Sequence, residues 1–139
     1  MTKQIWINLP VKDINKSKAF FSKLGFSFNE KHGNSQDSAC LLVGDKHFAV
    51  MLFLEATFKS FTRNNNTDTT LATEVLISID AESREEVDEI AKKVIEAGGT
   101  IFGQPDEKQG WIYGCGFADL DGHRWNVLYM DLSKMPKAS

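Results

Sequence analysis

Cysteine is scarce in this chain, which has Cys40 and Cys115 among its 139 residues. The two cysteines form no CxxC motif and no zinc-ligand pattern with the three histidines. The sequence therefore predicts neither a dithiol redox motif nor a structural zinc site. In a reducing compartment such cysteines are typical of buried thiols, and we favour this interpretation over a disulfide.

Long hydrophobic runs are absent as well. No segment approaches the roughly 18 consecutive apolar residues that a membrane-spanning helix needs. Residues Met1–Gln4 lead directly into a strand-like segment, without the charged and apolar regions of a signal peptide. These observations predict a cytoplasmic protein without a membrane partner.

The chain also lacks a strong excess of one charge. Its 16 basic and 19 acidic residues give a net charge of -3, and the basic residues are scattered. A nucleic-acid-binding surface would gather basic side chains on one face. No GxSxG motif, no P-loop and no GxGxxG motif after a strand is present. We therefore predict no nucleic-acid partner, and the sequence gives no support for the hydrolase or nucleotide-binding functions that these motifs indicate.

What the sequence does contain is an internal repeat. In the first copy, a strand over 5–11 leads to a helix that Asp13 caps and Gly25 ends. In the second copy, a strand over 74–80 leads to an amphipathic helix that begins at a capping box at Ser83. An internal repeat constrains the whole fold, and two copies indicate two similar modules.

Each strand–helix unit is followed by three further predicted strands. In the first module these cover 26–28, 38–43 and 47–54, and in the second 100–103, 111–118 and 124–130. The fold class is therefore α+β, with β-α-β-β-β occurring twice. The predicted boundaries are module one over 1–61, a linker over 62–73, module two over 74–132 and a tail over 133–139, which we expect to be disordered from Lys134 on. The polar stretch 63–70 fits a plain linker better than a mobile lid, and a short helix is expected over 56–61.

Three motifs carry a resemblance to a known family. They are Leu9–Asp13 with the exit Leu24-Gly25-Phe26, then Glu96–Gly99, and finally the hairpin Phe117–Trp125. In order and spacing they resemble the vicinal oxygen chelate superfamily, which includes glyoxalase I, bleomycin-resistance proteins and extradiol dioxygenases. The resemblance implies a single glyoxalase-like domain whose two βαβββ modules form a curled mixed sheet around a cleft. It also implies a homodimer.

The resemblance further implies a divalent metal held by four cavity side chains, usually His and Glu. The matching positions here are Trp6, Glu55, Glu74 and Asn126. Tryptophan offers a donor alone, and an asparagine carbonyl is a weaker ligand for a transition metal than a carboxylate. We therefore expect no metal cofactor, although Glu55 and Glu74 leave a hard divalent ion with water as an alternative.

Strand alternation gives the residues that point away from the helices. The set comprises Trp6, Asn8, Met51, Phe53, Glu55, Glu74, Leu76, Ser78, Arg124, Asn126 and Leu128, and we expect Trp111 and Tyr113 to join it. From this set we predict a ligand-binding cleft lined by Trp6, Asn8, Phe53, Glu55, Glu74, Trp111, Tyr113 and Asn126. Trp6 and Trp111 would stack on a planar or cationic ligand, with a glutamate as counter-charge. The alternative is that these aromatic side chains fill the cleft or a dimer seam.

Two functional hypotheses follow. The first is a glyoxalase/bleomycin-resistance-like protein that binds a small aromatic or cationic molecule in a metal-poor cleft. The alternative is a metal-dependent lyase, isomerase or dioxygenase of the same superfamily, in which the metal stabilises an enolate-like oxygen. The sequence nominates no catalytic residue.

Overall fold

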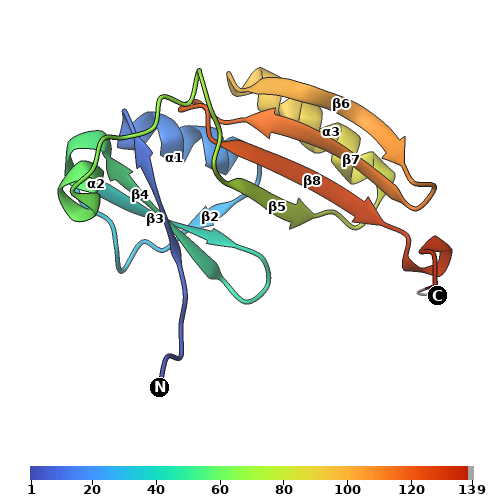
Figure 1. Ribbon diagram of the computed structural model, residues 1–139, viewed down its shortest axis with the longest axis horizontal. Helices are drawn as coiled ribbons and strands as arrows, with labels where there is room; N and C mark the ends of the chain where they lie inside the picture. The colour runs from blue at the N-terminus through green and yellow to red at the C-terminus, as the bar shows by residue number, and fades with distance from the viewer. Residues whose placement is uncertain (138–139) are drawn as a thin grey trace. The chain divides into compact units, whose positions relative to one another are not determined.

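The computed structural model describes residues 1–137 (Figure 1). It divides into two compact units, of which the first ends at Ala72 and the second begins at Thr73. No helix within residues 1–137 has the length and apolar character needed to cross a membrane.

The first unit has one four-stranded sheet in the order β1-β4-β3-β2. β1 runs parallel to β4, and the other pairs are antiparallel. Helix α1 packs against β2, β3 and β4, and α2 packs against β1 and β4. The elements are β1 (Ile7–Val11), α1 (Ile14–Lys23), β2 (Ser27–Phe28), β3 (Ser38–Val43), β4 (Phe48–Leu54) and α2 (Glu55–Thr62).

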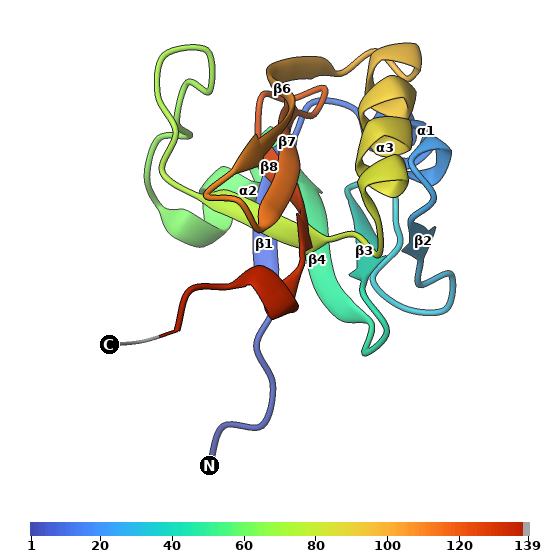
Figure 2. The same cartoon turned by 90° about the vertical axis from the view of Figure 1, so that its right-hand side faces the viewer.

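The second unit repeats this topology with the order β5-β8-β7-β6, and here β5 runs parallel to β8. Helix α3 lies along one face of the strands β6, β7 and β8, as the turned view in Figure 2 shows. The elements are β5 (Leu76–Asp80), α3 (Arg84–Glu96), β6 (Thr100–Lys108), β7 (Ile112–Ala118), β8 (Arg124–Met130) and the 3-10 turn η1 (Leu132–Lys134). The predicted α+β class with two βαβββ modules is confirmed.

We call the face of each sheet that its long helix covers the inner face, and the opposite face the outer face. The inner faces carry the cores, because alternate strand residues point toward the helix. In the second module Phe117 and Trp125 stack at 6.0 Å with their rings 4° from parallel. The fully buried inner-face side chains include Leu41, Val50 and Leu52 in the first module and Phe117, Trp125 and Val127 in the second.

Both helix starts form as predicted. The Asp13 carboxylate accepts a hydrogen bond from the Lys16 backbone N–H at 3.0 Å, and the Ser83 hydroxyl accepts from the Glu86 N–H at 3.1 Å. The reciprocal arm of the capping box is displaced by one residue, because the Glu86 carboxylate lies 3.5 Å from the backbone nitrogen of Glu82. Side-chain caps of this kind typically stabilise a helix by about 1 kcal/mol.

A buried carboxylate organises the connection between β7 and β8. One oxygen of Asp119 accepts from the backbone N–H groups of Asp121 and His123, both at 3.0 Å. The other accepts from the indole N–H of Trp125 at 3.1 Å. Burial raises the pKa of Asp119, against the effect of these hydrogen bonds and of His123. Asp121 and Gly122 therefore lie inside a five-residue connection that the Asp119 carboxylate stabilises.

Several predicted strand starts are wrong. β1 begins at Ile7 opposite Val50, not at Ile5, and the segment before it extends away from the first sheet (Figure 1). The side chains of Ile5 and Trp6 are 76% and 53% exposed. Likewise β5 begins at Leu76, opposite the first residue of β8, so the preceding residues have no strand to pair with.

The predicted length of the edge strand β6 is also wrong, because the sequence predicted a strand over 100–103 only. It runs over nine residues to Lys108 and carries irregularities between Ile101 and Asp106. Proline cannot donate a hydrogen bond to a neighbouring strand, so within a sheet it is tolerated on an edge strand such as β6. In a sequence, Pro105 instead suggests that a strand has ended. In α3 the apolar face is formed by the buried side chains of Val87, Ala91 and Val94, while Ile95 near its end is 60% exposed.

The structure describes residues 134–137 of the segment that we expected to be disordered. Lys134, expected to be disordered, closes η1, and the Asp131 side chain caps this turn by accepting from the Ser133 N–H at 3.1 Å. Residues 138 and 139 of the predicted tail lie outside the described residues.

Candidate functional site

The outer face of the second sheet is hollowed. The hollow has a volume of about 480 Å³ and lies over β6, β7 and β8. These are strands of a single module, so this hollow needs no contribution from the first module. It is lined by Phe102, Gly103, Gln104, Pro105, Asp106, Lys108, Gly114, Cys115, Gly116, Asn126 and Leu128.

Glycines form the floor of this hollow. A Cβ atom on Gly116 would lie 2.5 Å from Cε1 of the Phe102 ring, and one on Gly114 would lie 2.7 Å from Cδ2 of Leu128. Both distances are well inside van der Waals contact, so side chains on β7 would push these neighbours away. The floor therefore lets one aromatic and one aliphatic side chain lie directly against the sheet.

Two polar side chains on β8 lie on the same face as this floor, Asn126 in the lining and Arg124 next to the Phe102 ring. Asn126 lies opposite Gly116 on one side and Ser78 on the other. Its Oδ1 atom is buried and has no hydrogen-bond partner, and the same holds for Nε of Arg124. The Arg124 guanidinium carbon lies 4.3 Å from the centre of the Phe102 ring. Both residues were predicted to face away from the helix, and the pairing register places them on that face.

Tyr113 does not belong to this face, which corrects the prediction. Its hydroxyl donates to Asp88 of α3 at 2.6 Å, and the guanidinium of Arg84 lies 5.0 Å from its ring centre. The hydrogen bond to Asp88 raises the pKa of Tyr113. Tyr113 shares its face with Cys115 and Phe117, because residues two apart on a strand point the same way. It therefore helps to hold α3 on the sheet.

The remaining second-module candidates also lie outside the hollow. Trp111 occupies the turn before β7, where its backbone carbonyl accepts from the Asp131 N–H at 2.8 Å. Its indole N–H is buried without a hydrogen-bond partner. Glu74 is exposed and precedes β5. Neither residue lines the hollow.

The first-module candidates do not form one group. Asn8 pairs with Met51 across β1 and β4 and is exposed. Phe53 packs edge-on against Phe61 of α2, with the ring centres 5.1 Å apart. Glu55 is not the last residue of β4 but the first residue of α2, because β4 ends where its partner β1 ends. The prediction that these residues share a cleft with the second module stays a prediction.

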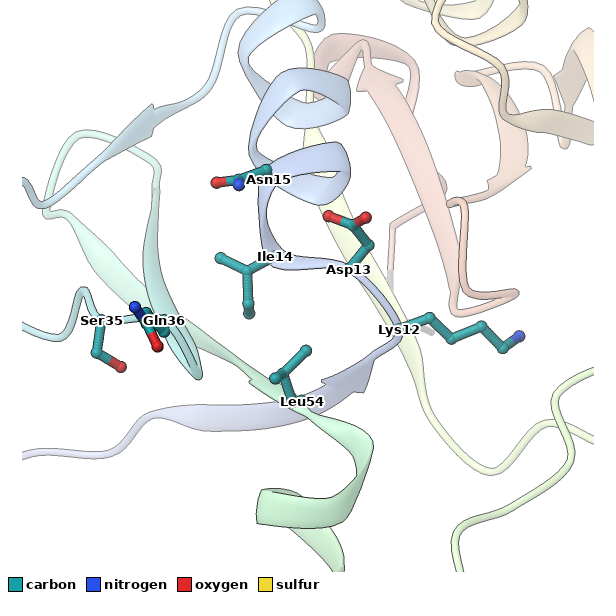
Figure 3. Close-up of a pocket in the computed structure, with 7 residues that line it drawn as sticks. All are labelled: Lys12, Asp13, Ile14, Asn15, Ser35, Gln36 and Leu54. Atoms are coloured by element: carbon teal, nitrogen blue, oxygen red, sulfur yellow. The ribbon is translucent and has the colours of Figure 1, made fainter.

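The first module has a hollow of its own, shown in Figure 3, with a volume of about 420 Å³. Ile14 and Leu54 form its apolar part, and Ser35 and Gln36 border it from the loop before β3. Within residues 1–137, the buried side-chain atoms without a hydrogen-bond partner belong to other residues. This hollow therefore carries a weaker indication of ligand binding than the one in the second module.

Sequence reasoning found Asn126 and Leu128 of the lining, and Arg124 on the same face, but missed most of the lining. The glycines of β7 were not among the residues predicted for the cleft. Their alternation was the available signal, since Gly114 and Gly116 share the outer face with Asn126. The β6 side chains could not be found, because the strand was predicted to end at Gly103.

Comparisons with known proteins agree with this fold. A family model for bleomycin resistance protein-like N-terminal regions matches residues 3–43. The hypothetical protein SA1046 from S. aureus is 34% identical, with a TM-score of 0.83, covering 93% of this chain and 95% of that one. The chain belongs to the vicinal oxygen chelate superfamily.

Two more distant structures share the fold of this vicinal oxygen chelate protein. A glyoxalase/bleomycin resistance protein/dioxygenase family enzyme from Burkholderia phytofirmans PsJN is 18% identical, with a TM-score of 0.76, covering 90% of this chain and 96% of that one. The fosfomycin resistance protein FosX from Listeria monocytogenes is 20% identical, with a TM-score of 0.66, covering 96% and 98%. No curated protein matches the sequence.

The residues of this vicinal oxygen chelate protein do not fit the metal that the superfamily implies. Within the described part of the chain, no three His, Cys, Asp or Glu side chains come together as a metal site. Trp6 precedes β1, Glu55 begins a helix and Glu74 precedes β5. Asn126 alone of the four matched positions lines the hollow, and it offers one neutral oxygen.

Proposed function

We propose that this protein binds a small planar organic molecule on the outer face of its second sheet. The observation that carries the proposal is the hollow with a glycine floor, in which Asn126 keeps a buried, unpaired side-chain oxygen. Binding pockets typically combine an apolar lining with a few convergent polar groups, and this hollow has that composition.

The unpaired oxygen supports a binding role on energetic grounds. A buried acceptor without a partner costs about 1–3 kcal/mol, and proteins therefore keep few of them. Gly116, opposite Asn126 on β7, has no side chain to supply a donor. A ligand that donates a hydrogen bond to Asn126 would offset this cost on binding.

The shape of the hollow supports a planar ligand. Gly114 and Gly116 let Leu128 and the Phe102 ring, which is 44% exposed, lie flat against β7 and form an apolar surface. A flat ring can lie against such a surface and stack on the phenylalanine.

Superfamily membership adds the expectation of a homodimer, which sedimentation at micromolar concentration tests.

A thermal-shift panel of planar compounds tests the proposal. We expect some compounds to raise the Tm, because a ligand that binds the folded state stabilises it. The variant Asn126→Leu should lose this shift, whereas Asn65→Leu, at an exposed asparagine outside both sheets, should keep it. A panel without any shift, or equal shifts in Asn126→Leu and the unaltered protein, would contradict the proposal.

A further inference from the structure

We infer that Arg124 and Asn126 together form a two-point polar anchor that selects a neutral or anionic planar ligand over a cationic one. The inference rests on the proposed binding role of the hollow and names the chemistry of its ligand. It also differs from the expectation of a cationic ligand, since the glutamates meant to provide the counter-charge lie elsewhere.

Arg124 is held in position by the ring beside it. Its guanidinium carbon lies 4.3 Å from the centre of the Phe102 ring, which lines the hollow. Stacking on an aromatic face leaves the edge of the guanidinium to donate hydrogen bonds. Nε is buried without a hydrogen-bond partner, so a ligand acceptor that reaches it from the hollow would supply the missing partner.

Asn126 provides the complementary group. It lies two residues after Arg124 on β8, and both residues are on the outer face. Its unpaired Oδ1 accepts a hydrogen bond, whereas the unpaired Nε of Arg124 donates one. Same-face residues two apart on a strand are roughly 7 Å apart along it. A matching ligand therefore carries its acceptor and its donor on separate atoms, with a ring between them.

The charges around the hollow favour an acidic acceptor. Asp106 and Lys108 at its border form an ion pair at 3.7 Å and largely compensate each other. Arg124 adds a positive charge that no ion pair within residues 1–137 offsets. A carboxylate on the ligand would gain a charge-assisted hydrogen bond there, while an ammonium group would be repelled.

Three benzene derivatives separate these possibilities by calorimetry. 4-Hydroxybenzoate has an acid, a ring and a hydroxyl donor; benzoate lacks the donor; 4-(aminomethyl)phenol replaces the acid with a cation. We expect 4-hydroxybenzoate to bind more tightly than benzoate by about tenfold, as one hydrogen bond to a buried acceptor predicts. The cationic probe should bind most weakly of the three.

Variants then assign the anchor. Arg124→Met keeps an unbranched side chain against Phe102 and removes the donors, so it should weaken 4-hydroxybenzoate binding by about tenfold or more. It should leave the affinity for 4-(aminomethyl)phenol unchanged or increased. Lys92→Met removes the same charge from an exposed position on α3 and should not alter any of the affinities. Urea unfolding of each variant checks that it is folded.

The outcomes distinguish the two proposals. If the probes bind and Asn126→Leu weakens them but Arg124→Met does not, the anchor is refuted and the binding role stands. Tighter binding of the cationic probe than of 4-hydroxybenzoate would also refute the anchor. If none of the three binds while other planar compounds shift the Tm through Asn126, the ligand chemistry inferred here is wrong. If no planar compound binds through Asn126, both proposals fail.

Discussion

The two modules have the same strand order, but the outer faces of their sheets differ. In the first, the connection between β2 and β3, residues 29–37, leaves the sheet and folds over its outer face. In the second, the corresponding edge strand β6 stays paired with β7 as far as Lys108, and the outer face of this sheet carries the hollow. One topology thus gives a filled face or a hollow, depending on where a single connection runs.

The filled face shows how the first module closes. Gly33 is packed so closely that a Cβ on it would lie 2.9 Å from Cβ of Cys40 and 3.1 Å from Cε of Met51. The Asn34 side-chain oxygen accepts from the Cys40 N–H at 3.3 Å, and the Ser38 hydroxyl donates to the Gly33 carbonyl at 2.8 Å. The loop therefore supplies both packing and hydrogen bonds to β3.

The pairing register shows which residues make the difference. Asn8 and Ser78 each lie five residues before the helix cap of their module, and they pair with Met51 and Asn126. Cys40 and Gly116 are next in the same rows. An apolar pair in the first module thus corresponds to a glycine and an unpaired amide in the second. An apolar contact in the first module is thus replaced in the second by a buried amide oxygen without a hydrogen-bond partner.

The largest predicted difference in stability is between variants in the β7–β8 connection of the second module and in the β3–β4 turn of the first. Asp119→Ala should lower the free energy of unfolding by about 3 kcal/mol, because it removes the acceptor of the buried Trp125 indole N–H and of two part-buried backbone N–H groups. Asp45→Ala, in the exposed turn of the first module, should change it by less than about 0.5 kcal/mol. Urea denaturation measures both, and equal losses would contradict this assignment.

A side chain on the glycine floor should also be costly. Gly116→Val should lower the free energy of unfolding by about 2 kcal/mol, since the Phe102 ring must move. It should also abolish binding to the hollow. The matched variant Cys40→Val changes an already filled position and should cost less than about 1.5 kcal/mol. A fully stable Gly116→Val protein that still binds planar compounds would show that the floor is not required.

Tyr113→Phe tests the assignment of inner and outer faces. Loss of the hydrogen bond to Asp88 should cost about 1 kcal/mol or less, because the pair is exposed. Ligand affinity should not change, since the hydroxyl points toward α3. A tenfold loss of affinity in this variant, measured by calorimetry, would return Tyr113 to the ligand site.

The two thiols should differ in alkaline solution. Burial, with Asp88 nearby, raises the pKa of Cys115 to about 11 from its ordinary value of 9.0, and burial also raises the pKa of Cys40. The folded state therefore holds the thiol proton more tightly than the unfolded state. The resulting stability is fully present below pH 9 and is lost as the pH rises toward 11.

Cys115→Ala removes this contribution, so its unfolding free energy should decline less between pH 9 and 10.5 than that of the unaltered protein. Cys40→Ala should show a smaller difference over the same interval. Identical pH profiles for Cys115→Ala and the unaltered protein would indicate an ordinary thiol at this position.

The sequence predicted the fold well because the fold is determined by local signals. Asp13 and Ser83 begin helices, and alternating apolar residues give the inner faces. Strand ends were harder to predict, since Ile5 and Glu74 fit the alternation but have no neighbouring strand to pair with. Tyr113 was predicted on the wrong face, because Trp111 and Tyr113 were assumed to lie together on the outer face of one strand. Trp111 in fact precedes β7.

The candidate site was predicted in part. Arg124 and Asn126 follow from alternation along β8, which is regular. The opposite wall depends on β6, whose irregular pairing around Pro105 leaves no clear period in the sequence. The covering of the first outer face was unpredictable for a similar reason, because it results from the path of a polar loop.

Mapping of ligand-induced NMR shifts tests the central claim most directly. In ¹⁵N-labelled protein titrated with 4-hydroxybenzoate, the largest amide shifts should occur at Gly114, Gly116 and Asn126. The corresponding positions of the filled face, Cys40 and Met51, should remain unchanged. Saturable shifts at Cys40 and Met51 without any at Gly114 and Gly116 would contradict the account.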